Sequence, residues 1–220
     1  MAAKLNTPAK VRVFLVDDHP IVRRGFQLLL GLERDLSVCG EADSFSPALE
    51  KMIQLKPDIA IIDLGLRDSS GLDLIKQVRE LLPELKILVF TMKSEQMYAE
   101  RALRAGANGY ITKEEGAEKA IEALRVIMQG KPYLGAQVAE SLMNRLAGGG
   151  QPGEATDLLS DRELEILEMI GTGLGTRQIA ERLKVSVKTI ESHREHIKSK
   201  LMLKKASELV NYAYNWVNRT

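Results

Sequence analysis

The sequence has a single cysteine and no long apolar run. Cys39 has no partner for a disulfide within the chain, and a lone thiol is typical of a reducing compartment. No stretch approaches the roughly 18 apolar residues that a membrane helix needs. The N-terminal segment also lacks an apolar run ahead of a small-residue cleavage site. We therefore expect a soluble, cytoplasmic protein with no membrane partner.

Composition is that of a folded chain, but its charge is unevenly distributed. Of the 220 residues, 45% are hydrophobic and 28% charged, which excludes wholesale disorder. Residues 1–132 carry 19 Lys/Arg against 19 Asp/Glu, whereas residues 176–205 carry nine against three, a net of +6. A basic block in a chain of net charge +1 favours nucleic-acid binding, although a solvated helix face can carry the same charge.

The clearest break in the chain is the glycine run Gly148–Gly150, which Gln-Pro-Gly follows. Such a stretch holds neither a helix nor a strand and predicts a flexible linker. We predict one domain over residues 10–132, a linker helix and Gly-rich linker over residues 133–156, and a second domain over residues 157–220.

Short apolar runs alternate with amphipathic segments in the first domain. The predicted strands are Val11–Val16, Leu36–Ala42, Ile59–Ile62, Ile87–Phe90 and Gly109–Thr112, and the predicted helices are Pro20–Leu32, Ser46–Lys56, Gly71–Leu82, Ser94–Ala105 and Ala117–Gln129. This alternation predicts an α/β fold, a doubly wound five-stranded parallel sheet. Right-handed crossovers then bring the carboxyl ends of all strands to one edge.

The second domain is predicted to be a small all-α domain of four helices. Ser160 and Glu163 form the pattern of a capping box, which opens a helix that runs through Ile170. Ser186 can cap the third helix. The other predicted helices are Arg177–Leu183, Val187–Leu201 and Lys205–Val217, with an apolar stripe of Leu209, Val210, Ala213 and Val217 in the last. A short helix, a tight turn and a longer basic helix are typical of a helix-turn-helix.

Polar residues stand where the strands of the first domain end: Asp17, Asp18, Asp63, Thr91 and Lys113. Ligands of open α/β sheets bind at this edge. Crowded carboxylates repel one another unless a cation joins them, and hard oxygen ligands favour Mg²⁺ or Mn²⁺ over Zn²⁺. A hydroxyl and an ammonium can bind phosphoryl oxygens, and one carboxylate can become an aspartyl phosphate. A single Asp in such a place more often caps a turn, but the whole set is harder to dismiss.

These residues lie in three motifs: Val-Asp-Asp-His-Pro20, Asp63 with Gly71 eight residues later, and Ala-Gly-Ala-Asn-Gly-Tyr-Ile-Thr-Lys113. Together they resemble the flavodoxin-like receiver domain of two-component response regulators over residues 11–130. Two positions differ from the family pattern, Arg67 and Glu114, where relatives commonly have proline. Neither difference removes a functional group.

The receiver resemblance implies a role for each residue of the predicted site. Asp63 would be the phosphoryl acceptor. Asp18 and Asp63 would bind Mg²⁺ directly and Asp17 through water, with the Gly65 carbonyl completing the site. Thr91 would hydrogen-bond the phosphoryl group, Lys113 would ion-pair with it, and Tyr110 would be a rotameric switch. The three histidines of the chain, His19, His193 and His196, are scattered in the sequence and predict no metal site.

The second domain resembles the LuxR-type DNA-binding domain in Leu159-Ser-Asp-Arg-Glu163, in Gly173-Leu-Gly-Thr-Arg-Gln-Ile-Ala180, and in Val185-Ser-Val-Lys-Thr-Ile-Glu-Ser-His-Arg194 with Lys200-Leu201. Receiver plus this domain is the architecture of NarL/FixJ-family response regulators. Candidate phosphate contacts are Arg177, Lys188, Thr189, Arg194, Lys198 and Lys200, and candidate base contacts are Glu191, Ser192 and Glu195. For each, a solvated helix face is the plain alternative.

The resemblance implies a response regulator that takes a phosphoryl group on Asp63 from a sensor histidine kinase, forms a homodimer, and then controls binding to double-stranded DNA and transcription. It implies no dedicated enzyme. A Mg²⁺-dependent phosphatase of the haloacid dehalogenase type is one alternative, but Gly65 stands where that family needs a second acid. A helical domain that binds protein is another, supported by Glu191 and Glu195.

Overall fold

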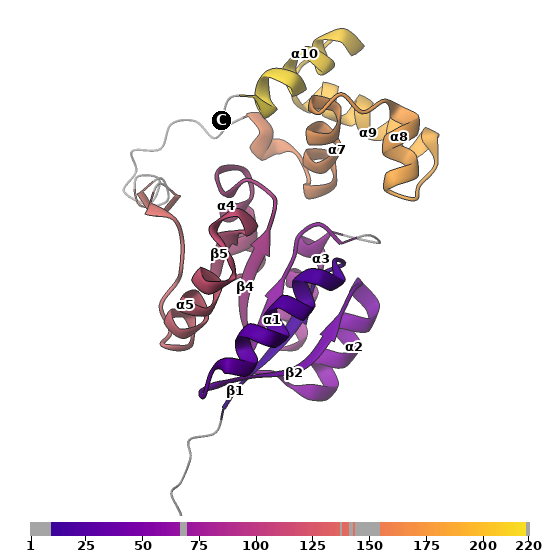
Figure 1. The fold of residues 1–220 in the computed structure, drawn as a ribbon. Coiled ribbons are helices and arrows are strands. Elements are labelled where there is room, and N and C mark those ends of the chain that lie inside the picture. The colour runs from indigo at the N-terminus through magenta and orange to yellow at the C-terminus, as the bar shows by residue number, and fades with distance from the viewer. Residues whose placement is uncertain (1–9, 67–69, 137, 141–142, 144–154, 219–220) are drawn as a thin grey trace, which may run out of the picture. The chain divides into compact units, whose positions relative to one another are not determined.

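The computed structural model describes residues 10–66, 70–136, 138–140, 143 and 155–218 (Figure 1). The chain folds into two compact units, residues 1–143 and 144–220, and each is described by itself. Arg67 and the predicted Gly-rich linker lie outside the described residues.

The N-terminal unit contains the predicted parallel sheet. Its strands are β1 (Val11–Val16), β2 (Leu36–Ala42), β3 (Ile59–Ile62), β4 (Lys86–Thr91) and β5 (Gly109–Thr112), in the order β2-β1-β3-β4-β5. This is the flavodoxin-like order, and it confirms the predicted fold. The register of β1 shifts between Val13 and Phe14 where it pairs with β2.

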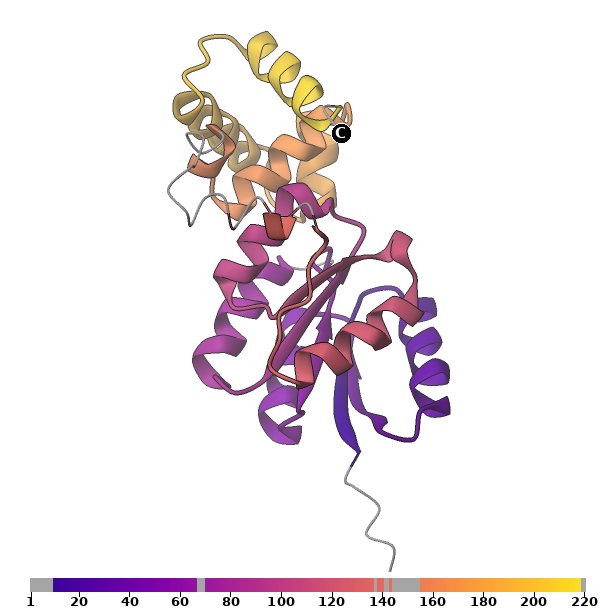
Figure 2. The same cartoon turned by 90° about the vertical axis from the view of Figure 1, so that its left-hand side faces the viewer.

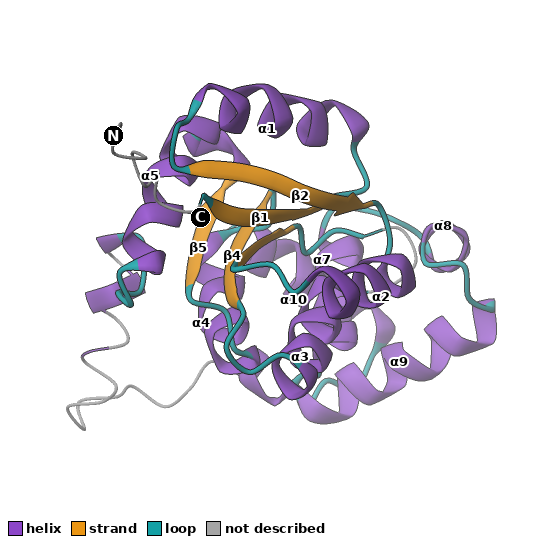
Figure 3. Ribbon diagram, turned by 90° about the horizontal axis from the view of Figure 1, so that it is seen from below, coloured by secondary structure: helices purple, strands orange, loops and turns teal. Residues whose placement is uncertain are grey.

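Helices cover both faces of the sheet, because successive strand residues point to opposite sides. Two helices, α1 (Pro20–Leu32) and α5 (Ala117–Met128), share one face, and Figure 2 shows α5 in front of the strands. The other face carries α2 (Phe45–Leu55), α3 (Gly71–Leu81) and α4 (Glu95–Ala105) (Figure 3). Because helices cover both of its faces, the sheet is a rigid support for the loops at its edges.

The segment after α5 is held to the rest of the N-terminal unit by hydrogen bonds. The Tyr133 amide donates to the Asn108 carbonyl at 3.1 Å, and the Tyr110 amide donates to the Tyr133 carbonyl at 2.9 Å. The Gly135 amide then donates to the Glu95 carboxylate at 2.6 Å. Of the predicted linker helix, residues 136, 138–140 and 143 are helical, and the rest lies outside the described residues.

The C-terminal unit consists of helices α7 (Asp161–Gly171), α8 (Thr176–Arg182), α9 (Val187–Lys200) and α10 (Ala206–Val217) after a short 3-10 turn, η2 (Ala155–Leu158). The predicted capping box is confirmed: the Ser160 amide donates to Glu163 Oε2 at 2.7 Å, and the Glu163 amide donates to Ser160 Oγ at 3.3 Å. The predicted cap of α9 is also confirmed, because Ser186 Oγ accepts from the Thr189 amide at 3.0 Å.

The buried stripe of α10 differs from the prediction. Leu209 and Ala213 are buried, but Val210 is 42% exposed and Trp216 is buried instead. Residues three and four apart share a helix face, and Trp216 follows Ala213 by three, so the stripe continues through Trp216. Gly171 lies so close to α10 that a Cβ there would come within 2.5 Å of the Ala213 carbonyl oxygen. At Gly171, therefore, the backbones of α7 and α10 pack directly against each other, with no side chain between them.

Candidate functional site: a buried acidic cluster and an exposed helix face

The sheet brings the predicted acidic residues together. Asp17 and Asp18 follow β1 and Asp63 follows β3, and one carboxylate oxygen of each lies within 4.8 Å of the others. Asp17 and Asp63 are each 4% exposed. Neighbouring β1 and β3 end side by side, so residues far apart in sequence meet at one buried point.

Lys113 lies between two of these carboxylates. It opens a short 3-10 turn after β5, η1 (Lys113–Glu115), and its Nζ is 2.6 Å from Asp63 Oδ2 and 2.7 Å from Asp17 Oδ2. Burial lowers the pKa of Lys113, but the charge of Asp63 and the bonds to both carboxylates outweigh it and raise the pKa above its ordinary value. Burial also raises the pKa of Asp17, against the opposing effect of Lys113. The ammonium is therefore held in its charged form.

Two glycines shape the loop beside Asp63. The Gly65 amide donates to Asp63 Oδ1 at 3.0 Å, so each oxygen of Asp63 accepts a hydrogen bond, one from Gly65 and one from Lys113. A Cβ at Gly71 would lie 2.3 Å from the Asp63 carbonyl oxygen. Only glycine permits α3 to begin this close to the strand end.

Two partners of the cluster, His19 and Arg23, were not predicted from the sequence, and a ring nitrogen of His19 lies within 4.8 Å of the carboxylate oxygens. The His19 ring lies with Nδ1 2.6 Å from Asp18 Oδ1, and its backbone amide donates to Asp17 Oδ1 at 2.8 Å. The Arg23 guanidinium donates to the Asp17 carbonyl at 2.6 Å. The only hint in the sequence is position: His19 follows the acidic pair directly, and Arg23 follows one helical turn later.

Thr91 and Tyr110, the predicted switch residues, meet at the loop after β4. Each is 1% exposed. Thr91 Oγ1 accepts from the Lys93 amide at 3.3 Å, and the Tyr110 hydroxyl donates to the Lys93 carbonyl at 2.9 Å. Both side chains are thus hydrogen-bonded to the backbone of Lys93.

The candidate DNA contacts differ in exposure. Arg194 and Lys198 are half-buried, and the other seven are exposed. Two of the cations already have acidic partners: Lys198 Nζ is 2.8 Å from Glu195 Oε2, and Lys200 Nζ is 2.6 Å from Glu163 Oε2. Lys188 lies at the exposed start of α9, near its N-cap.

Comparison with known proteins gives a consistent result for both units. The family described as "Response regulator receiver domain" matches residues 13–125, and the family "Bacterial regulatory proteins, luxR family" matches residues 157–213. The chain belongs to the LuxR-type response regulators.

Similar response regulators extend over nearly the whole chain. The oxygen regulatory protein NreC of Staphylococcus epidermidis is 39% identical over 210 residues, covering 92% of this chain and 96% of the relative. NreC of Staphylococcus carnosus is 40% identical over 209 residues, with the same coverage. A solved structure of RcsB from Salmonella enterica serovar Typhimurium, bound to promoter rprA with the phosphomimetic BeF₃⁻, is 27% identical, covers 93% of this chain and 98% of its own, and has a TM-score of 0.62.

Membership in the response regulators excludes one of the alternative functions considered above. The family consists of DNA-binding transcriptional regulators and not of dedicated enzymes, so the phosphatase alternative is set aside. No helix in the described part of the chain is both long and apolar enough to cross a membrane.

The acidic cluster fits the divalent cation that receiver domains bind. Its side chains offer three carboxylates, whose oxygens are the hard ligands that Mg²⁺ prefers, and the ring of His19. Three carboxylates and one ammonium give a formal charge of −3 + 1 = −2 around the site, which a divalent cation neutralises. Asp17, Asp18 and Asp63 are the side chains that would hold it.

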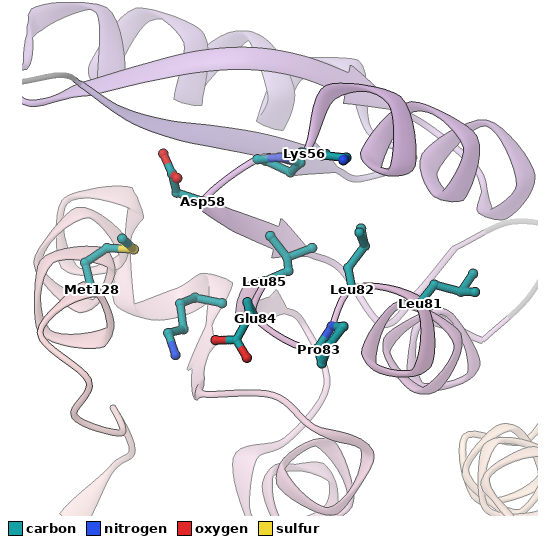
Figure 4. Close-up of a pocket in the computed structure, with 10 residues that line it drawn as sticks. Lys56, Asp58, Leu81, Leu82, Pro83, Glu84, Leu85 and Met128 are labelled. Atoms are coloured by element: carbon teal, nitrogen blue, oxygen red, sulfur yellow. The ribbon is translucent and has the colours of Figure 1, made fainter.

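A separate cavity of about 430 Å³ lies at the opposite edge of the sheet (Figure 4). It is formed by residues that precede β3 and β4, including Asp58 and Leu85, and by Met128 at the end of α5. None of the residues that line this cavity is one of the predicted site residues.

Proposed function

We propose that Asp63 accepts a phosphoryl group from a sensor histidine kinase and that phosphorylation controls DNA binding by the second unit. The observation that carries the proposal is the state of Asp63: it is buried among carboxylates at the carboxyl ends of the strands, with Lys113 on one oxygen and the Gly65 amide on the other. DNA as the partner implies that the protein works in the cytoplasm.

The transfer is an in-line displacement at phosphorus. An oxygen of Asp63 forms the new P–O bond as the P–N bond of the kinase phosphohistidine breaks, and the histidine leaves with the electron pair. Mg²⁺, when bound, neutralises charge on the phosphoryl oxygens. Lys113, already 2.6 Å from Asp63 Oδ2, then pairs with a phosphoryl oxygen.

Phosphorylation is read out through the loop after β4. The Thr91 hydroxyl donates to a phosphoryl oxygen and gives up its contact with the Lys93 amide. Because the Lys93 carbonyl also accepts from Tyr110, movement of this backbone unit repositions the tyrosine. The altered surface around Tyr110 and α4 favours a homodimer.

DNA binds to the exposed face of α9, which enters the major groove. The phosphate contacts are Arg177, Lys188, Thr189, Arg194, Lys198 and Lys200, and the base contacts are Glu191, Ser192 and Glu195. The ion pair of Lys200 with Glu163 competes with its phosphate contact, so Lys188 contributes more. The solved complex of RcsB with promoter rprA supports this mode of action.

Intact mass spectrometry after incubation with acetyl phosphate and Mg²⁺ tests the acceptor. Wild type and Asp73→Asn, an exposed carboxylate on α3, should each gain one phosphoryl group, and Asp63→Asn should gain none. Duplex DNA affinity should rise with phosphodonor in the first two proteins alone. A phosphodonor-dependent rise in Asp63→Asn would overturn the proposal, and binding insensitive to salt would favour a protein ligand for α9.

A further inference from the structure

A second cluster of potential ligands lies in the C-terminal unit. One ligand atom each of Glu163, His193 and His196 lies within 4.8 Å of the others. The sequence pattern gave no sign of it, because Glu163 and His193 are 30 positions apart and the histidines looked scattered. The packing of α7 against α9 brings them together.

Helix geometry places the two histidines as neighbours. His193 and His196 are three residues apart on α9, so they share one face. Their ring centroids are 6.5 Å apart with perpendicular planes. Glu163 lies in the first turn of α7, where the capping box fixes its carboxylate. The cluster is thus built on two packed helices, not on a loop.

One ring nitrogen of the half-buried His193 points to a ligand. Nδ1 of His193 is buried and has no hydrogen-bond partner among the described residues, whereas buried polar atoms in proteins are nearly always satisfied. A metal ion is one ligand that an unpartnered imidazole nitrogen can bind.

Glu163 keeps a coordinating oxygen. It is 4% exposed, and the bonds from Ser160 and Lys200 both go to Oε2, so binding through Oε1 displaces neither. The nearby cations are each paired, Lys200 with Glu163 and Arg162 with Glu165 at 2.7 Å.

We propose that Glu163, His193 and His196 bind a first-row divalent metal ion of the Zn²⁺ class. Two imidazoles and one carboxylate are a ligand set that suits Zn²⁺, whereas the receiver cluster, with three carboxylates and one imidazole, is richer in the oxygen ligands that Mg²⁺ prefers. His196 is exposed, so the fourth position is open to water and the ion exchanges with solvent. The bound ion joins the N-terminal turn of α7 to the helix that carries most of the candidate DNA contacts.

Calorimetric titration of the full-length protein with ZnCl₂ tests the site, in millimolar Mg²⁺ to occupy the receiver cluster. Wild type should bind one equivalent of Zn²⁺, and His196→Gln should bind it more than about tenfold more weakly. His196 is exposed, so this variant keeps its fold. His19→Gln, which alters the histidine of the receiver cluster, is the matched control and should retain the equivalent.

Co²⁺ absorption gives an independent readout. The visible bands of a four-coordinate Co²⁺ complex should appear in wild type and His19→Gln and be lost in both His196→Gln and Glu163→Gln. Equal Zn²⁺ affinity in wild type and His196→Gln, or no binding in the presence of Mg²⁺, would overturn the proposal. Asp63 plays no part in the experiment, so its outcome is separate from that of the phosphorylation test.

Discussion

The two units handle their charged residues in opposite ways. In the N-terminal unit Asp17 and Asp63 are buried at the ends of the neighbouring strands β1 and β3, and both are paired with the half-buried Lys113. In the C-terminal unit seven of the nine candidate DNA contacts are exposed on α8 and α9, and one of them, Lys200, is paired with the buried Glu163. Bond-making chemistry needs groups fixed against a rigid support, whereas groove binding needs groups that reach outward.

The largest effect is expected when Lys113 is removed from between Asp17 and Asp63. Lys113→Met leaves Asp17 and Asp63 without their ammonium, and we expect a loss of about 3 kcal/mol in the free energy of unfolding, measured by urea denaturation in EDTA. Millimolar Mg²⁺ should recover part of it, because the cation replaces the lost charge. The exposed Lys76→Met on α3 is the control and should change little. Equal stability of the two variants would contradict the prediction.

A second change tests the backbone contact under Asp63. Gly71→Ala forces a Cβ against the Asp63 carbonyl and should cost about 2 kcal/mol, together with slower labelling by acetyl phosphate. Gly25→Ala, where no atom lies within 4 Å, should instead add about 0.5–1 kcal/mol through helix propensity. Urea denaturation of both variants measures the difference. A stable, normally labelled Gly71→Ala would show that the loop can relax.

The comparison on the DNA-binding side is between two exposed lysines of α9, Lys188 and Lys200, of which Lys200 is paired with Glu163. Lys188→Ala should weaken DNA binding several-fold and reduce the slope of log affinity against log salt by about 1, measured by fluorescence anisotropy. Lys200→Met should reduce the slope less but lower the melting temperature of the C-terminal unit, because Glu163 loses its partner. Identical slopes in the two variants would contradict the proposed difference.

The smallest expected effect concerns a surface network. Arg125 on α5 pairs with Glu33 and with Asp35, and these bonds lower the pKa of Asp35. A lowered carboxyl pKa contributes stability above the unfolded value of 3.8 that is lost as pH falls through the folded value. Arg125→Gln should therefore lower the free energy of unfolding by less than about 1 kcal/mol at pH 7, and the difference should shrink as pH falls below 3.8. Urea denaturation of wild type and variant across this pH range measures the difference.

The positions of site residues could be predicted from the sequence where the course of the main chain alone determines them. A polar residue that directly follows an apolar strand must lie at the sheet edge, so the meeting of Asp17, Asp63 and Lys113 could be predicted. The capping box of α7 depends only on local spacing and was also predictable. The phosphoryl and DNA roles of these residues stay predictions until the experiments above are done.

Side-chain choices within the packed units could not be predicted. The turn of His19 toward Asp18 depends on a rotamer, and the burial of Trp216 in place of Val210 depends on how α10 lies against α7. The meeting of Glu163 with His193 depends on the packing of two helices that no pattern in either segment reveals. Tertiary packing, rather than local preference, decides each of these.

The backbone pairing of Tyr133 has a practical consequence for dividing the protein. β5 is the edge strand of the sheet, and Tyr133 covers part of that edge with two hydrogen bonds. A fragment cut at residue 125, where the receiver match ends, exposes these unpaired groups, and open edges recruit strands from other molecules. An isolated receiver should therefore extend through Gly135, whose amide bonds to Glu95, to resist aggregation.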